Sequence, residues 1–224
     1  MRAQQPVTRV PTFHARRGRL SSLNRRRLAL LGPRFALRDE VLAAACARRA
    51  AGRGRVVLEV GSGYGAAAIA YAATHPSDVL IAVDVHPSGV ARTLAAADEH
   101  GLTNVCILLA DAVELLELRV PGGALDAVHL FFPDPWPKTR HRRRRFVSPQ
   151  TLDLLADRLT GTGEVLVATD SPEYAAYTER VVRDHGGFTA GRSPRPSWRP
   201  VEGYEAKGIA AGHPAIDLRL VRNG

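Results

Sequence analysis

The chain has 224 residues, 45% of them hydrophobic, and a formal net charge of +9. This length and apolar content are sufficient for one α/β domain, and the absence of a long apolar run argues against a membrane span and a secretory signal. The two cysteines, Cys46 and Cys106, and the scattered histidines lack metal-ligand spacing. The sequence therefore predicts a cytoplasmic protein with reduced thiols and no metal.

Strands and helices alternate along most of the sequence, after one or two helices predicted within residues 21–50. The predicted strands are 56–60, 79–84, 105–109, 125–132, 163–169 and 215–221. The predicted helices are 66–74, 88–100, 112–118, 149–159 and 172–185, and a Pro-rich loop is expected over 191–200. Continuous apolar strands separated by helices predict an α/β fold with a doubly wound, mostly parallel sheet covered on both faces.

Basic residues are concentrated in two segments. Residues 1–38 contain ten arginines and no acid, and residues 138–145 contain six Lys/Arg and no acid, although the whole chain has 22 Asp/Glu. We therefore divide the chain into a basic N-terminal arm and helix, 1–38, and a domain of residues 39–224. Two basic segments on an otherwise acidic chain predict a localised binding site for a polyanion such as RNA.

A glycine-rich turn follows the first strand, at residues 59–65. Its G-x-G-x-G spacing differs from the G-x-G-x-x-G of dinucleotide sites, and Glu59 before it would repel a pyrophosphate but suits a cationic ligand. Asp84 ends the second strand, where it suits ribose hydroxyls, and Asp111 ends the third, where it can meet an adenine amino group. The three acids predict a site for S-adenosylmethionine, although each could instead be a helix cap or turn residue.

The most distinctive segment follows the fourth strand, where residues 131–138 read Phe-Phe-Pro-Asp-Pro-Trp-Pro-Lys. Prolines on both sides of Asp134 restrict the loop, so this carboxylate is predicted to be held in place before any substrate binds. Trp136 either packs beneath the loop or stacks on an RNA base, and we favour packing. The basic residues expected to contact phosphates are Lys138, Arg140, His141 and Arg142 to Arg145, with Arg16, Arg17 and Arg19 of the arm.

These motifs resemble the tRNA (guanine-N7)-methyltransferase family, class I S-adenosylmethionine-dependent enzymes, over about residues 13–222. The proline–tryptophan loop is a highly specific motif of this family, and the glycine loop is a weak one. The matching positions are 17–19, Glu59, Gly61, Gly63, Gly65, Asp84, His86, Asp111, Ala112, 131–138, Arg140, His141, Thr169, Asp170, 199–205 and Gly208. The resemblance implies a seven-stranded, Rossmann-like sheet and methyl transfer to N7 of guanine 46 in the variable loop of tRNA, by a monomer or a homodimer.

The resemblance also implies a role for each motif residue. The cofactor-binding residues are expected to be Glu59, Gly61, Gly63, Gly65, Asp84, His86, Asp111, Ala112 and Asp134. The substrate-binding residues are expected to be Lys138, Arg140, His141, Arg144, Asp170, Glu202, Tyr204 and Glu205. Asp134 is predicted to be catalytic by positioning and charge stabilisation, because guanine N7 carries no proton to remove. Asp134, Asp170 and Glu205 are expected to accept hydrogen bonds from guanine N1–H and the exocyclic amine.

Two positions depart from the family pattern, since Asp84 stands for a Glu and Glu202 for a Thr. Alternatives also stay open: a methyltransferase acting on another RNA, a small molecule or a protein, a nicotinamide-dependent oxidoreductase, or a non-enzymatic RNA-binding module. The segregated basic residues argue against a small-molecule or protein substrate, and Glu59 argues against the oxidoreductase. The strand-end acids argue against a module without catalysis. His129, inside the fourth strand, is predicted to be a core histidine.

Overall fold

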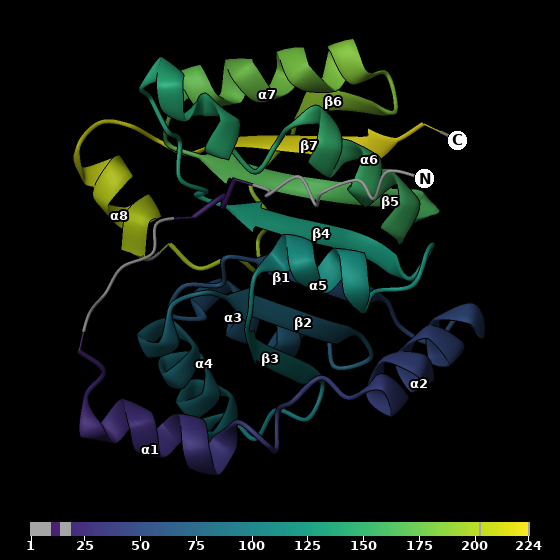
Figure 1. Ribbon diagram of the computed structural model, residues 1–224, viewed down its shortest axis with the longest axis vertical. Coiled ribbons are helices and arrows are strands. Elements are labelled where there is room, and N and C mark those ends of the chain that lie inside the picture. Colours follow the sequence, from purple (N-terminus) through teal and green to yellow (C-terminus); the bar gives the residue numbers. More distant parts are fainter. Residues whose placement is uncertain (1–9, 14–18, 202, 224) are drawn as a thin grey trace, which may run out of the picture.

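The computed structural model describes residues 10–13, 19–201 and 203–223. Seven strands form one sheet in the order β3-β2-β1-β4-β5-β7-β6. The strands are β1 Val56–Val60, β2 Val79–Asp84, β3 Val105–Leu109, β4 Leu125–Phe131, β5 Leu159–Thr169, β6 Phe188–Arg192 and β7 Ile216–Arg222. The strands β1 to β5 run parallel, and β7 is antiparallel to both β5 and β6 (Figure 1). The predicted doubly wound, mostly parallel sheet is confirmed.

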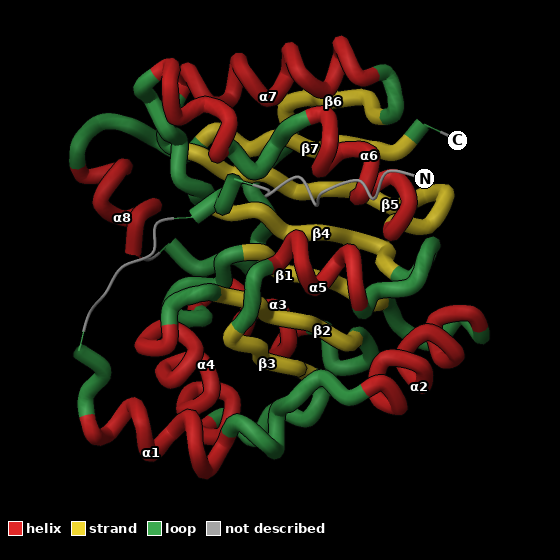
Figure 2. Tube along the Cα trace, viewed as in Figure 1, coloured by secondary structure: helices red, strands yellow, loops and turns green. Residues whose placement is uncertain are grey.

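Helices cover both faces of the sheet, as the alternating pattern predicted (Figure 2). They are α1 Ser22–Leu31, α2 Asp39–Ala50, α3 Ala66–Thr74, α4 Pro87–Glu99, α5 Ala112–Leu118, α6 Pro149–Arg158, α7 Pro172–His185 and α8 Gly203–Ala210. Their starts follow local sequence signals, because Ser148 and Ser171 cap α6 and α7 and a proline occupies the first turn of α4, α6 and α7. None of these helices in the described ranges is long and apolar enough to cross a lipid bilayer.

Alternating side chains of the strands enter two separate apolar cores. On one face Leu58, Val128 and Leu130 pack with residues of α2, α5, α6 and α7. On the other face Val57 and Ala127 pack with residues of α3 and α4. Both faces of the central strands are therefore buried, which explains why these strands are apolar without alternation.

The segment before the sheet shares these cores. Helix α1 packs against α4, Phe35 and Leu37 are buried in different cores, and the Phe35 carbonyl accepts a hydrogen bond from the edge strand at Ile107. The described residues between 19 and 38 therefore lie against the domain. Arg16 and Arg17 lie outside the described residues, and the division of the chain at residue 38 stays a prediction.

The sequence missed three elements, among them the 3-10 helix Thr139–Arg144, and misplaced one boundary. Strand β6 was not predicted, because it is five residues long, contains a glycine and pairs only with β7 at the sheet edge. Helix α8 was not predicted, because its eight residues include two glycines and give no helical periodicity. Helix α6 ends at Arg158 and β5 begins at Leu159, four residues earlier than expected, with an irregular register opposite β4.

Candidate active site

The glycine loop after β1 is held against the end of β2. Backbone N–H groups of Gly61 and Ser62 donate to the Val83 carbonyl at 2.8 and 3.1 Å. Gly61, Gly63 and Gly65 have φ angles of 72°, 58° and 86°, which glycine adopts without steric strain. A Cβ on Gly65 would lie 2.6 Å from the Thr93 side chain, so glycine also allows the loop to approach α4 closely.

Glu59 is the buried acid of this loop. Its side chain is enclosed, and its Oε2 atom makes no hydrogen bond to the described part of the chain. Burial, with a smaller contribution from the neighbouring Asp84, raises the pKa of Glu59 to about 8. An unpaired carboxylate oxygen in such a place is costly, and a ligand that brings a cationic hydrogen-bond donor would remove the cost. Glu59 therefore fits a ligand with an ammonium group.

Asp84 is turned toward the protein. Its Oδ2 accepts from the N–H of Gly63 at 2.8 Å, and its Oδ1 accepts from the N–H of His86 at 2.7 Å and lies 3.0 Å from His86 Nδ1. The carboxylate accepts two backbone hydrogen bonds and keeps further acceptor capacity, so the expected ribose contact of Asp84 stays a prediction. These hydrogen bonds hold the carboxylate against the glycine loop and stabilise its turn.

Asp111 occupies the corresponding place after β3. Its Oδ1 accepts a hydrogen bond from the N–H of Val113 at 2.8 Å and so caps α5, whose first residue is the buried Ala112. The helix cap given above as the alternative role of these acids is thus present at Asp111. A cap orients the carboxylate without consuming all its acceptor capacity, and Asp111 can still accept from a ligand.

The loop after β4 holds Asp134 in an unusual backbone. Phe132 and Trp136, on either side of Asp134, have positive φ angles of 51° and 42°, and each such non-glycine residue costs about 1–3 kcal/mol. Asp134 itself is exposed. The Trp136 side chain is buried, with the Arg144 guanidinium 4.5 Å from its ring centroid and the His141 ring edge-on at 5.7 Å. Trp136 therefore packs under the loop, as we favoured.

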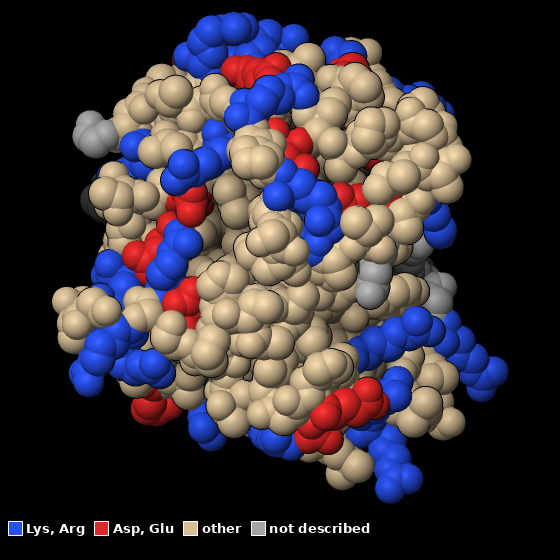
Figure 3. Space-filling model, turned by 180° about the vertical axis from the view of Figure 1, so that it is seen from behind, with Lys and Arg blue, Asp and Glu red and all other residues tan. Residues whose placement is uncertain are grey.

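The basic block, residues 138–145, contains a short 3-10 helix, Thr139–Arg144, directly after this loop. Lys138, Arg140, Arg142 and Arg143 are exposed, and His141 and Arg144 are half-buried. Arg145 was expected to contact phosphate, but only 1% of its surface is accessible, so it cannot reach RNA in this conformation. The view from behind shows charges of both signs placed around a broad uncharged area (Figure 3).

Helix α8 lies beside the loop that follows β5, at the left of Figure 1. A Cβ on Gly208 of α8 would lie 3.4 Å from the Asp170 Cβ, so α8 and the half-buried Asp170 are close neighbours. Glu202 and the side chain of Tyr204, both predicted to bind substrate, lie outside the described residues.

Glu205 of α8 does not face the substrate side as an open acceptor. It is buried, and it accepts hydrogen bonds from Arg195 Nε at 2.7 Å and from Arg199 Nη2 at 3.0 Å. Arg199 in turn binds Asp217 of β7 at 2.5 Å. This buried ion-pair cluster attaches α8 and the Pro-rich loop to the sheet. Sequence reasoning missed it, because nothing in the spacing of these residues pairs them.

His129 is buried in β4, as predicted, but its environment is unusual. Its ring stacks on Trp198 at 5.0 Å and on Phe131 at 5.2 Å, and its Nδ1 has no hydrogen-bond partner in the described ranges. Burial, followed by the charge of Arg55, lowers the pKa of His129 to about 3. The ring is therefore neutral at physiological pH, and His129 serves the aromatic packing under the Pro-rich loop.

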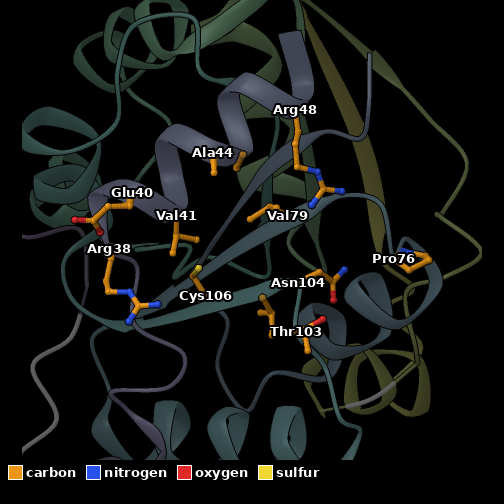
Figure 4. Close-up of a pocket in the computed structure, with 12 residues that line it drawn as sticks. Arg38, Glu40, Val41, Ala44, Arg48, Pro76, Val79, Thr103, Asn104 and Cys106 are labelled. Carbon is orange, nitrogen blue, oxygen red and sulfur yellow. The ribbon is translucent and has the colours of Figure 1, made fainter. Parts of the chain in front are cut away.

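A cavity of about 710 Å³ lies at the amino ends of β2 and β3, whereas the predicted site residues lie at the carboxyl ends of the strands (Figure 4). It is lined by Arg38, by residues of α2, among them Glu40 and Arg48, and by Asn104 and Cys106. Ligands of open α/β sheets bind at the carboxyl ends of the strands, and none of the predicted site residues lines this cavity. No group of three or more potential metal-binding side chains occurs among the residues that the structure describes.

The carboxyl ends of the parallel strands bring the two loops together. Strands β1 and β4 are neighbours, with Glu59 opposite His129 and Val60 opposite Leu130. The glycine loop and the Asp134 loop therefore leave the sheet side by side, with the β2 and β3 acids beyond one loop and Asp170 after β5 beyond the other. This arrangement places the loop of the buried Glu59 next to the exposed Asp134 and the exposed basic residues that follow it.

Known proteins are similar to this chain in sequence and in fold. A family model described as "Putative methyltransferase" matches residues 53–218. The tRNA (guanine-N(7)-)-methyltransferases of Streptomyces avermitilis and Nitrosospira multiformis are 38% and 36% identical to this chain, over 96% and 95% of its length and 76% and 94% of theirs. A variant of the 16S rRNA (adenine(1408)-N(1))-methyltransferase from Catenulisporales acidiphilia, solved with the cosubstrate SAM, superposes with a TM-score of 0.59 at 19% identity, covering 84% of this chain and 92% of that one. The chain belongs to the tRNA (guanine-N7)-methyltransferase family, which implies S-adenosylmethionine as co-substrate.

Proposed function

We propose that this protein transfers a methyl group from S-adenosylmethionine to N7 of a guanine in tRNA, and that the target is guanine 46 of the variable loop. Family membership over nearly the whole chain carries the reaction class. The observation that supports it in the structure is the adjacency of two loops, one with the unpaired Glu59 oxygen and one with the exposed Asp134. A tRNA substrate also makes a cytoplasmic location the natural expectation.

S-adenosylmethionine, when bound, supplies an electrophilic methyl group on a sulfonium. Glu59 would accept hydrogen bonds from its ammonium, and the turn of Gly61 to Gly65 would let the backbone approach it closely. Asp111 would accept from the adenine amine, and Asp84 would support the loop and add negative charge beside the ribose. These residues suit a cationic ligand without phosphate, because the loop places acids where a phosphate would be repelled.

Asp134 and Asp170 would orient the guanine. N7 has a lone pair and no proton, so the protein needs no general base at that atom. It needs N7 in line with the methyl group at about 3–3.5 Å, and it needs negative charge near the purine, which becomes cationic. A carboxylate that accepts from guanine N1–H and the exocyclic amine meets both needs and rejects adenine, which lacks that donor pair. The proposed role does not extend to Glu205, because its carboxylate accepts hydrogen bonds from two arginines.

Labelled S-adenosylmethionine and unmodified tRNA test the proposal directly. We expect label in 7-methylguanosine after digestion of the tRNA to nucleosides. A matched tRNA with adenine at position 46 should take up no label. Methylation of that control at another guanine would retain the reaction but contradict the position, and label in another nucleoside would contradict the reaction itself. The same digestion of a ribosomal RNA substrate tests the alternative of a different RNA.

A further inference from the structure

The last arginine of the basic block differs from the others. Arg142 and Arg143 are exposed, whereas the Arg145 side chain is fully enclosed. Burying a guanidinium is costly unless its charge is paired and its donors are satisfied. Burial of the Arg145 charge therefore has a cost in free energy, and the contacts of Arg145 indicate what the residue stabilises.

Two of these contacts are to the backbone of the Asp134 loop. Arg145 Nε donates to the Pro135 carbonyl at 2.9 Å, and its Nη2 donates to the Trp136 carbonyl at 3.3 Å. Pro135 and Trp136 are the two residues directly after Asp134. The planar guanidinium can hold two neighbouring carbonyls at a fixed separation, which an ammonium cannot.

This loop needs external support. Phe132 and Trp136 hold positive φ angles without being glycines, and such backbone persists only where surrounding contacts determine it. The N–H of Phe132 donates to the Ala168 carbonyl at 2.7 Å, which fixes the start of the loop. Arg145 fixes its end, so Asp134 lies between two anchored points.

Arg145 also ties the loop to the first turn of α7. Its Nη2 donates to Glu173 Oε2 at 2.7 Å, and its guanidinium carbon lies 4.3 Å from the centroid of the Tyr177 ring. Glu173 also forms an ion pair with Arg142, with 3.3 Å between Glu173 Oε1 and Arg142 Nη2. Because α7 begins two residues after Asp170, one guanidinium connects the segments that carry both proposed guanine-binding carboxylates.

We propose that Arg145 is a positioning residue for methyl transfer: it fixes the backbone on which Asp134 is presented and aligns it with the segment of Asp170. This inference rests on the proposed function, since it assumes that Asp134 acts on the guanine. It separates the basic block into exposed residues that face RNA and one buried residue that supports the reacting site. Arg145 acts through Asp134 and does not touch the substrate.

Steady-state kinetics of Arg145→Lys and Arg143→Gln test this division. Arg145→Lys keeps the charge but loses the paired donors, so we expect kcat to fall by about 10–100-fold through misplacement of Asp134, with KM for tRNA within about twofold of wild type. Arg143→Gln, the exposed control from the same block, should raise KM in a salt-dependent manner and leave kcat within about twofold. A wild-type kcat in Arg145→Lys would overturn the proposal.

A second readout follows the loop without catalysis. In a Trp198→Phe background Trp136 is the single tryptophan, because the chain has two. Arg145→Lys should shift its emission to the red and increase its quenching by acrylamide, and Arg143→Gln should not. Slower catalysis with an unchanged Trp136 signal, or a changed signal with normal catalysis, would each overturn the positioning role.

Glu173→Gln guards against a folding failure of Arg145→Lys. The Glu173 side chain is 49% exposed, and the Gln oxygen can still accept the hydrogen bond from Arg145, so this replacement is expected to leave the fold intact while it weakens the attachment to α7. We expect a smaller kcat loss of about threefold, in the same direction and with the same spectral change. If the wild-type protein methylates no tRNA, the proposed function fails and the catalytic role of Arg145 fails with it. The Trp136 comparison then still decides whether Arg145 holds the loop.

Discussion

The two loops at the carboxyl edge of the sheet are held in place by different means. In the glycine loop, positive φ angles fall on Gly61, Gly63 and Gly65, so the turn is unstrained and backbone hydrogen bonds suffice to hold it. In the Asp134 loop, positive φ angles fall on Phe132 and Trp136, and the turn is held by the buried Arg145 side chain together with a backbone hydrogen bond from Phe132 to Ala168. Substitutions around the first loop should therefore act locally, whereas the second loop depends on residues outside it.

The two loops also differ in the state of their carboxylates. Glu59 is enclosed, and burial raises its pKa to about 8, so its charge depends on a ligand. Asp134 is exposed and presented to the solvent side. Glu59 is thus suited to bind a cationic group of a ligand in an enclosed site. Asp134 is suited to contact a large substrate that arrives from solution.

The largest expected effect separates catalysis from cofactor binding. Asp134→Ala should lower kcat for tRNA methylation by a factor on the order of 10² or more, because a group that orients and stabilises the reacting base is lost. Its affinity for S-adenosylmethionine, measured by calorimetry, should change by less than about threefold. Asp184→Ala, which removes an exposed acid of α7 far along the helix, is the matched control and should keep normal turnover. Near-normal turnover in Asp134→Ala would remove the distinction between the two loops.

The next effect concerns the charge of Glu59. Glu59→Gln should weaken binding of S-adenosylmethionine by roughly 10–100-fold, since it removes a buried charge partner. Because the pKa of Glu59 is about 8 in the free protein, the wild type must release a proton to bind a cation. Wild-type affinity should therefore rise with pH between about 5.5 and 7.5, with a slope approaching one log unit per pH unit, and the variant should show no slope. Equal slopes would mean that Glu59 does not meet the ammonium.

Glu59 should also make the stability of the free protein depend on pH, in the direction opposite to that of the affinity for S-adenosylmethionine. The folded-state pKa of Glu59 lies above its ordinary value of 4.5, so the folded protein binds the additional proton between about pH 4.5 and 8. Stability should fall as pH rises through this window. Glu59→Gln removes the penalty, so its melting temperature should exceed that of the wild type above pH 8 and approach it near pH 5. A melting-temperature difference that is independent of pH would contradict the buried, shifted carboxyl.

The sequence predicted much of the candidate site, because the positions of many of its residues depend on local sequence patterns. The acids at the ends of β1, β2 and β3 and the glycine turn are each fixed by the few residues around them. Arg145 could not be distinguished from Arg142 to Arg144, because burial depends on where α7 supplies Glu173 and Tyr177, which lie about 30 residues further along the chain. Glu205 could not be separated from Asp170 for a different reason: its partners Arg195 and Arg199 are near in sequence but lie in an irregular loop, whose conformation no local pattern predicts.

A smaller effect should distinguish the exposed arginines from the buried one. Replacing Lys138, Arg140 and Arg143 with Gln should raise KM for tRNA and flatten the dependence of log affinity on log salt by roughly one unit per lost phosphate contact. Binding of S-adenosylmethionine should be unchanged, because the cofactor has no phosphate. Unchanged salt slopes in filter binding would mean that the RNA docks elsewhere.

The smallest expected effect concerns Glu202, at a position where the family resemblance leads us to expect Thr. A carboxylate near tRNA phosphates is repelled by them, so Glu202→Thr should keep or raise activity, by no more than about threefold, through a lower KM. Glu202→Gln serves as the control, because it removes the charge without supplying a hydroxyl. If both variants gain equally, the charge alone limits binding in the wild type, and if only Thr gains, the hydroxyl contributes. A tenfold loss in both variants would show that this chain uses the Glu202 carboxylate as a ligand, and the substrate side of the site would then contain a third acid beside Asp134 and Asp170.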